Sequence, residues 1–128
     1  MRQAIWILIL LAYATGIAVT SHQPLGGMAT GMLHLDKLFH LLEFAVFMLL
    51  AWRAMGKRWW IALAISLAFA CSDELHQLFV PGRVASGWDF LADTMGIALA
   101  GWMLRSRARL WRFLCTRILS RKRTEGGE

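Results

Sequence analysis

The hydrophobic positions of this chain fall into four long runs that polar residues seldom interrupt. The runs cover Ala4–Thr20, Leu38–Trp52, Trp59–Phe79 and Asp89–Leu104. A helix or strand of a soluble protein would alternate apolar and polar positions with a period of 3.6 or 2 residues, whereas these runs are nearly continuous and about as long as a bilayer is thick. The pattern predicts an all-α, polytopic membrane protein with four transmembrane helices.

The last part of the chain has a different composition and predicts a separate element. Residues 1–105 form the predicted four-helix membrane domain, and residues 106–128 form a basic tail in a chain of net charge +6. Leu110, Leu114 and Ile118 share one face of a helix, with arginines largely elsewhere. This pattern predicts an amphipathic helix on the anionic inner leaflet. The lipid bilayer is therefore the expected partner of the tail, and no nucleic-acid partner is predicted.

The distribution of basic residues predicts the orientation of the four runs. Arg2, the basic turn at 53–58 and the tail fall on one side, and only Lys37 and Arg83 fall on the other. Because cytoplasmic loops are rich in Lys and Arg, both termini are predicted to be cytoplasmic, in a multi-pass protein of the cytoplasmic (inner) membrane. Tryptophans expected at the inner interface agree with this orientation: Trp6, Trp52, Trp59, Trp60 and Trp102.

A cleaved signal peptide is the alternative interpretation of the first run. Arg2 would belong to a short basic n-region, and small residues follow the apolar segment. The run is longer than a usual signal-peptide core, however, and contains no clear A-x-A cleavage site. We therefore interpret it as a membrane span.

Six carboxylates lie within or beside the apolar runs, where an ionisable group is costly unless something compensates it. At ~1.5 Å of rise per residue, the second, third and fourth runs all bring their acids to the outer third of a ~30 Å hydrocarbon core. Asp36, His40 and Glu43 fall at i, i+4 and i+7, so they share one helical face. The pattern predicts a polar crevice that opens outward. The six carboxylates are Asp36, Glu43, Asp73, Glu74, Asp89 and Asp93.

The candidate ligand-binding residues combine these acids with the neighbouring polar groups. Arg83 is predicted to fold back over the mouth of the crevice and to pair with a carboxylate. Purely structural roles are the alternative, with Asp36 and Asp89 as helix caps and Asp93 or Glu74 as an interhelical strut. The complete candidate set is Asp36, Lys37, His40, Glu43, Asp73, Glu74, Gln77, Arg83, Ser86, Asp89 and Asp93.

Four spaced motifs in residues 1–105 resemble those of VanZ-like membrane proteins. The segment Asp36–Phe44 resembles the signature D-K-x-x-H-x-x-E/x-[YF], and Asp73–Gln77 is similar to D-E-x-x-Q. The segments Pro81–Ser86 and Asp89–Gly96 match the P-x-R-x-x-S and D-x-x-x-[ND]-x-x-G blocks that follow. Many members carry Asn at the position of Asp93.

The resemblance implies a location better than it implies a reaction. The family is named for a protein associated with resistance to the glycopeptide teicoplanin. This implies action at the outer face of the cytoplasmic membrane, with a cell-envelope precursor or a glycopeptide as partner. Small residues at helical spacing, such as Ala62, Ser66 and Ala70, would also permit a homo-oligomer.

Two functions stay open at the level of sequence. The first is a non-catalytic envelope protein whose crevice binds a polar group of a lipid-linked precursor, an antibiotic or a partner. The second is a membrane-embedded hydrolase or transferase that acts on a lipid-linked envelope substrate. The candidates for catalytic roles are His40, Glu43, Asp73, Glu74 and Arg83.

Two features are missing from the catalytic interpretation. Neither Ser72 nor Ser86 has a base partner that the sequence defines, so no nucleophile is predicted. Metal-ligand spacing such as H-E-x-x-H or a Cys pair is absent from the sequence, so no dedicated metal site is predicted and no cofactor is named. A divalent cation could nevertheless neutralise the excess of acids.

Proton-linked transport is a further function that clustered acids suit. Ser66 is the only polar residue in the inner half of the predicted spans, however, so the sequence shows no continuous polar path across the membrane.

Overall fold

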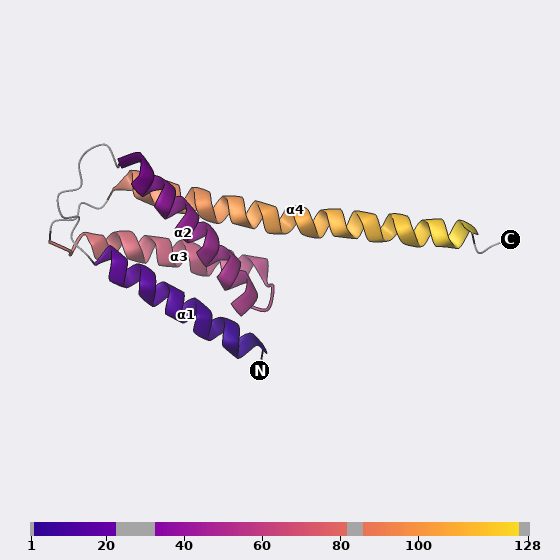
Figure 1. Cartoon of the computed structure of the whole chain (residues 1–128), viewed down its shortest axis with the longest axis horizontal. Helices are drawn as coiled ribbons and strands as arrows, with labels where there is room; N and C mark the ends of the chain where they lie inside the picture. Colours follow the sequence, from indigo (N-terminus) through magenta and orange to yellow (C-terminus); the bar gives the residue numbers. More distant parts are fainter. Residues whose placement is uncertain (1, 23–32, 82–85, 126–128) are drawn as a thin grey trace.

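The chain folds into four helices in this computed structural model, which describes residues 2–22, 33–81 and 86–125. The helices are α1 (Arg2–Ser21), α2 (Leu33–Ala54), α3 (Trp59–Gln77) and α4 (Gly87–Glu125), with no strand among the described residues (Figure 1). Successive helices run in opposite directions, so α2 and α4 both begin at the end of the bundle where α1 and α3 finish (Figure 1). The prediction of an all-α protein is confirmed.

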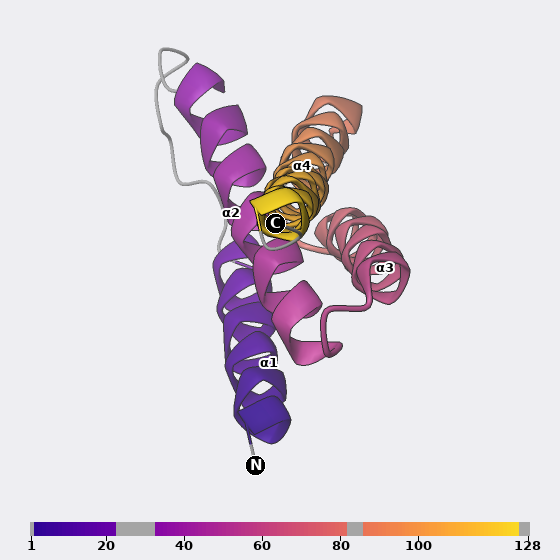
Figure 2. The ribbon, with the colours of Figure 1, turned by 90° about the vertical axis from the view of Figure 1, so that its right-hand side faces the viewer.

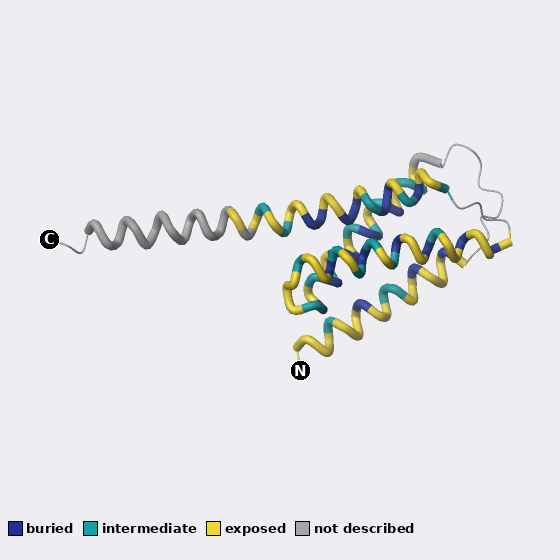
Figure 3. The backbone as a smooth tube through the Cα atoms, turned by 180° about the vertical axis from the view of Figure 1, so that it is seen from behind, coloured by how far each residue is buried: buried dark blue, intermediate teal, exposed yellow. Residues whose placement is uncertain are grey.

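Helix α2 is the centre of the bundle. It packs against α1, α3 and α4, and its interface with α4 is the most extensive, whereas α1 and α4 do not contact one another (Figure 2). Phe44, Phe47 and Met48 of α2 are buried, and Phe47 stacks on Phe69 of α3 with the ring centroids 4.6 Å apart. Ile97 of α4 completes this core. The buried positions follow the inward faces of the helices, and the outward faces are exposed (Figure 3).

The turn between α2 and α3 reverses the chain in four residues, Met55–Arg58. Gly56 (φ 61°) and Lys57 (φ 67°) adopt left-handed backbone conformations. The Lys57 N–H donates to the Trp52 carbonyl (2.8 Å) and the Gly56 N–H to the Arg53 carbonyl (3.3 Å). These two bonds form the Schellman motif that ends many helices, and Gly56 supplies the position where a left-handed backbone costs least.

Helix α4 differs from the sequence prediction. The structure has one continuous helix of 39 residues where a transmembrane helix and a separate amphipathic helix were predicted. No glycine or proline occurs between Trp102 and Glu125, so nothing in the sequence breaks the backbone hydrogen-bond ladder. At 1.5 Å per residue α4 is ~58 Å long, and it extends well past the other three helices (Figure 1). The predicted boundary at residues 105/106 falls inside it.

Length and apolar composition single out one of the described helices as able to cross a membrane. That helix is α1, whose most apolar window has a mean hydropathy of 2.0 and is only 17% buried. Helices α2, α3 and α4 carry carboxylates and basic residues among their apolar positions, which lowers their hydropathy. The four-span arrangement therefore stays a prediction at this point.

Candidate functional site

Buried polar side chains gather at one end of the bundle, where α1 and α3 finish and α2 and α4 begin. We call this the polar end. The core nearer the opposite end is built from apolar side chains and small residues, with Ser66 as a buried polar residue. The buried polar residues of the polar end are Ser21, His40, Asp73, Gln77, Asp89 and Asp93.

Two pairs of polar side chains connect α2 to α4. The Lys37 ammonium pairs with Asp89 Oδ1, and His40 Nδ1 lies 3.0 Å from Asp93 Oδ1. The helices α2 and α4 run in the same direction. The second pair therefore lies about one helical turn after the first, three residues later on α2 and four residues later on α4. The second pair is the deeper one, with the Asp93 side chain 0% exposed and that of His40 8% exposed.

Asp36 adds a third acidic group to this interface. One donor atom each from Asp36, His40 and Asp89 lie within 4.8 Å of one another. The sequence predicted no metal site, because these three residues come from two helices and match no short metal-binding motif.

Glu74 brings α3 to the same place. Its Oε2 accepts a hydrogen bond from the Ser86 backbone N–H (3.2 Å), and its carboxyl interacts electrostatically with Asp89, Asp93 and His40. Oε1 of Glu74 and Oδ2 of Asp93 are buried and have no hydrogen-bond partner among the residues that the structure describes. We call the group that meets here the His40 cluster, and it consists of Asp36, Lys37, His40, Glu74, Asp89 and Asp93.

Asp73 forms a neighbouring network between α1 and α3. Its Oδ2 accepts hydrogen bonds from Ser21 Oγ (3.1 Å) and Gln77 Nε2 (2.9 Å), and all three residues are buried. Asp73 is also within electrostatic range of Asp93. The predicted i, i+4 pair of Asp73 and Gln77 is therefore a direct hydrogen bond, and the network lies beside the His40 cluster.

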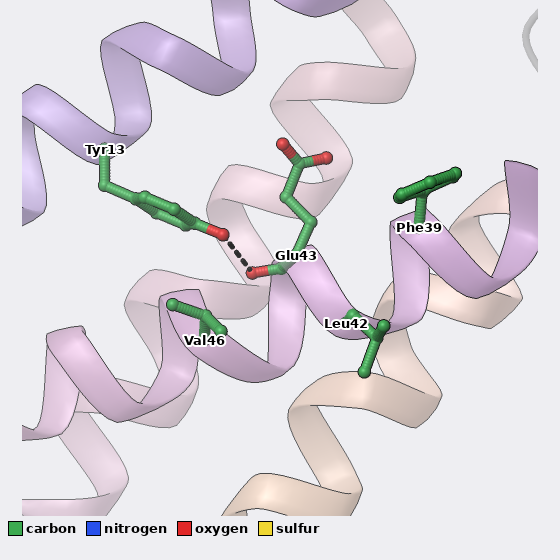
Figure 4. Close-up of a pocket in the computed structure, with 5 residues that line it drawn as sticks. All are labelled: Tyr13, Phe39, Leu42, Glu43 and Val46. Atoms are coloured by element: carbon green, nitrogen blue, oxygen red, sulfur yellow. Dashed lines mark hydrogen bonds between the residues drawn. The ribbon is translucent and has the colours of Figure 1, made fainter.

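Glu43 lies on the side of α2 that faces α1. The Tyr13 hydroxyl donates to the Glu43 backbone carbonyl (3.2 Å), and both residues line a hollow of about 300 Å³ with Phe39, Leu42 and Val46. The Glu43 carboxylate points away from Phe39 and Leu42 (Figure 4). The structure thus brings Asp36 and His40 together with Asp89 of α4, whereas Glu43 contacts α1 through its backbone carbonyl, although all three share a predicted face.

The two remaining candidates, Ser86 and Arg83, precede α4 in the sequence. Ser86 caps α4, because its Oγ accepts from the Trp88 backbone N–H (3.3 Å) and its carbonyl accepts from the Asp89 N–H (2.8 Å). The cap is thus Ser86, and the Asp89 carboxylate pairs with Lys37. Arg83, predicted to cover the mouth of the crevice, lies outside the described residues.

Sequence reasoning missed three residues of the polar end. Ser21 is not among the predicted candidates, yet it donates to Asp73. His22 and His76 are not among them either, yet His22 Nδ1 lies 3.2 Å from His76 Nε2 at the exposed ends of α1 and α3. The only sequence signal was that these residues sit at matching ends of the first and third runs, which does not identify a pairing.

The opposite end of the bundle is basic and aromatic. The Gln3 amide donates to the Ala54 carbonyl (3.2 Å), which fixes the start of α1 beside the end of α2. The Arg53 guanidinium lies over the ring of Trp6 (5.2 Å), and that of Arg105 over Trp59 (5.5 Å). Contacts of this kind stabilise a cation against an aromatic face. The bundle therefore has one acidic end and one basic end.

Comparison with known proteins gives one match. No curated protein and no solved structure matches the chain. A family model described as VanZ/LLP1 matches residues 3–111, a segment that contains every residue of the His40 cluster and of the Asp73 network. This agrees with the resemblance of the motifs, and the chain belongs to the VanZ/LLP1 family.

Proposed function

We propose that this chain is a multi-pass protein of the cytoplasmic membrane whose polar end faces outward and binds a polar group of an envelope ligand. The observation that carries the proposal is that polar side chains are buried and large apolar side chains are exposed, the reverse of their distribution in a soluble protein. Acids, His40 and Gln77 are buried, while large apolar side chains are exposed on every helix, such as Leu8, Phe39 and Trp60.

Energetics favour a bilayer around this surface. Leaving a large apolar side chain in water costs about 1.5–3 kcal/mol relative to burying it. Leu8 (66% exposed), Phe39 (67%), Trp60 (69%) and Phe79 (83%) alone would forgo an amount comparable with the ~5–15 kcal/mol net stability of a domain. In hydrocarbon the same surface carries no such cost, and buried polar side chains that bond one another are what membrane bundles contain.

The charge distribution supports the proposed orientation. Arg2, Arg53, Lys57 and Arg58 lie at the end opposite the His40 cluster, together with the projecting part of α4. A basic end with tryptophans matches the cytoplasmic interface of membrane proteins. Both termini are then cytoplasmic, and the His40 cluster lies under the outer headgroups. The arginines beyond the bundle would contact the anionic inner leaflet.

The site itself suits binding. Four acids surround Lys37 and His40 in the His40 cluster, and two carboxylate oxygens lack partners. Such a site attracts a cationic group, or an amide or ammonium of a lipid-linked envelope precursor or of a glycopeptide. Tolerance of glycopeptide antibiotics is the envelope phenotype that this proposal, in line with the family's name, connects to the site.

Asp73→Asn tests whether these groups do more than hold the helices together. Asparagine keeps the size of the side chain and can still accept from Ser21 and Gln77, so the protein should fold. We expect normal yield of monodisperse protein but loss of glycopeptide tolerance in cells that depend on this chain. The control is Ser72→Ala, an exposed neighbour. Loss of yield in parallel with the phenotype would instead identify Asp73 as a purely structural strut.

A hydrolase or transferase is the second candidate, because Asp93 orients His40 as a carboxylate orients the base of many catalytic sites. Among the described residues we find no hydroxyl or thiol that bonds His40, so the reaction would need water as the nucleophile. Incubating membranes with a labelled lipid-linked precursor distinguishes the two functions. A covalently changed product that disappears in His40→Gln would replace the binding proposal with an enzymatic one.

A further inference from the structure

We propose that the His40 cluster is a binding site for a divalent transition-metal cation, with Zn²⁺ as the reference ion. The proposal deepens the function given above, because it concerns the same crevice at the polar end. It assigns the ligands as Asp36 and His40 of α2 and Asp89 of α4.

The donor geometry is close to that of a metal centre. Zn²⁺ binds carboxylate oxygen and imidazole nitrogen at about 2.0–2.2 Å, so two donors on one ion are at most ~4.4 Å apart. The donor atoms of Asp36, His40 and Asp89 already lie within 4.8 Å of one another. A small rotation of side chains is enough to close the site, with no movement of the helices.

His40 is held as a metal-binding histidine is usually held. A metal-ligating imidazole almost always donates its other ring N–H to a carboxylate or carbonyl, which fixes the tautomer and orients the ring. Asp93 Oδ1 lies 3.0 Å from Nδ1 of His40. In the neutral tautomer with the proton on Nδ1, Nε2 would carry the lone pair that binds the cation. In this proposal Asp93 orients the ring of His40 and is not itself a ligand of the metal.

The second, independent observation is a pair of buried carboxylate oxygens that have no hydrogen-bond partner among the described residues. Asp93 is 0% exposed, and its Oδ2 has no hydrogen-bond partner. Oδ1 of the same carboxylate contacts His40, one of the three proposed ligands. Glu74 Oε1, on α3, is likewise buried without a partner. Buried carboxylate oxygens without a partner are rare and call for a proton or a cation, and two of them at one cluster favour a divalent ion.

Lys37 is the built-in competitor for this cation. Its ammonium pairs with Asp89, one of the three ligands, so it supplies positive charge where the metal would bind. The Lys37 side chain is 32% exposed, which leaves it room to move outward. A metal ion that takes Asp89 would displace the ammonium toward the headgroups. Removing this charge should therefore strengthen metal binding.

The mixed donor set selects the class of ion. Ca²⁺ takes six to eight oxygen ligands, and Mg²⁺ prefers oxygen with several waters retained. One imidazole with two carboxylates suits Zn²⁺ or a similar first-row ion. The cluster would leave at least one position on the ion open, and that position would receive the polar group of the envelope ligand.

The test measures Zn²⁺ binding to the full chain in phosphatidylcholine nanodiscs by equilibrium dialysis and elemental analysis. We expect one Zn²⁺ per chain in the unaltered protein. Asp36→Asn and His40→Gln should weaken binding about tenfold or more, and Lys37→Gln should strengthen it. Asp36 is partly exposed, so its variant keeps the test valid if His40→Gln fails to fold. Co²⁺ in place of Zn²⁺ should give visible absorption that Asp36→Asn changes.

The matched control is His76→Gln, the same chemical change at an exposed histidine of the polar end. Loss of Zn²⁺ in this variant, with retention in Asp36→Asn, would assign the ion to the His22–His76 pair and overturn the proposal. Folded protein that binds no Zn²⁺ at micromolar free ion would also overturn it. Intact glycopeptide tolerance in a protein that binds no metal would refute the metal site alone. Bound metal in a protein whose Asp73→Asn variant keeps full tolerance would refute the proposed function alone.

Discussion

At Gly96, α4 approaches the backbone of α2 closely. A Cβ atom added there would lie 2.0 Å from the Leu41 carbonyl oxygen and 3.1 Å from the Ala45 nitrogen. Both are backbone atoms, which cannot move aside without shifting the helix. This single residue therefore sets how closely the ligands of α2 and α4 approach one another, because Lys37–Asp89 and His40–Asp93 cross the same interface.

Replacing Gly96 with alanine should separate α2 from α4. Overpacking of this kind costs about 1–3 kcal/mol or more, and we expect a lower temperature of aggregation for the detergent-solubilised protein. The control is Gly16→Ala on α1, where an added Cβ meets nothing within 4 Å and alanine favours the helix. Equal thermal stability of the two variants would show that the close approach at Gly96 is not required.

The pair of His40 and Asp93 should respond differently to removal of each partner. His40→Ala leaves a fully buried carboxylate with neither of its oxygens paired, a change that costs about 3–5 kcal/mol. Asp93→Asn keeps an oxygen that can accept from His40 and removes the buried charge, so its cost should be within about 1.5 kcal/mol. Thermal unfolding in detergent measures both. Greater destabilisation by Asp93→Asn would contradict the pairing.

At the scale of elements, the helices were predictable and their ends were less so. The four apolar runs fall on α1–α4, since near-continuous hydrophobicity over about twenty residues has few other solutions. The extra turn at the start of α2, from Leu33, was missed because polar residues there resemble a loop. The fusion of the tail with α4 was missed for a different reason: a change from apolar to basic composition was taken as a break, although no residue in the segment breaks a helix.

The site was predictable in depth but not in pairing. Helical spacing and rise correctly gathered Asp36, His40, Asp73, Asp89 and Asp93 at one end of the bundle, because both depend on backbone geometry alone. Which side chains bond depends on how helices rotate about their axes and cross, and the pattern does not contain that information.

Ser21 and Glu43 illustrate this limit in opposite directions. Packing of α1 against α3 places Ser21 on Asp73, and packing of α1 against α2 draws the Glu43 region toward Tyr13. Neither contact can be predicted from the sequence of one helix considered alone.

Continuity of α4 can be measured directly as a distance. Spin labels on Leu91→Cys and on the native Cys115, with Cys71 replaced by serine, are 24 residues apart, which corresponds to ~36 Å along an unbroken helix. We expect a narrow distribution centred near this value in double electron–electron resonance, broadened only by the labels. A tail that bends at residue 105 onto the membrane surface would give a shorter and wider distribution, and the structure of α4 would then be wrong.

At the scale of the whole molecule, the carboxylates of the candidate site also make the proposed membrane spans hard to recognise from hydropathy. Asp36, Glu43, Asp73, Asp89 and Asp93 lower the hydropathy of α2–α4, so that α1 alone satisfies a simple criterion for a span. Most of these carboxylates are buried inside the bundle, where hydropathy counts them as though they faced lipid. The exposed faces of the same helices are apolar. Exposure after folding, rather than composition, is therefore the property that supports the proposed membrane location.

Membrane insertion and orientation can be tested together by cysteine accessibility. In a chain with Cys71 and Cys115 replaced by serine, His22→Cys marks the polar end and Lys57→Cys marks the basic turn, and both positions are exposed. We expect a membrane-impermeant maleimide to label His22→Cys on intact cells and to label Lys57→Cys only after the cells are permeabilised. The physical reason is that the basic turn resists translocation, whereas the polar end carries mostly acids.

Each other outcome identifies a different error in the proposal. Labelling of Lys57→Cys on intact cells would reverse the orientation and place the His40 cluster on the cytoplasmic side, out of reach of envelope ligands. Recovery of the protein from the supernatant of alkaline-washed membranes would remove the bilayer altogether. The exposed apolar faces of α1–α4 would then need a protein partner of comparable area, because about 25 cal/mol is forgone for each Å² left in water.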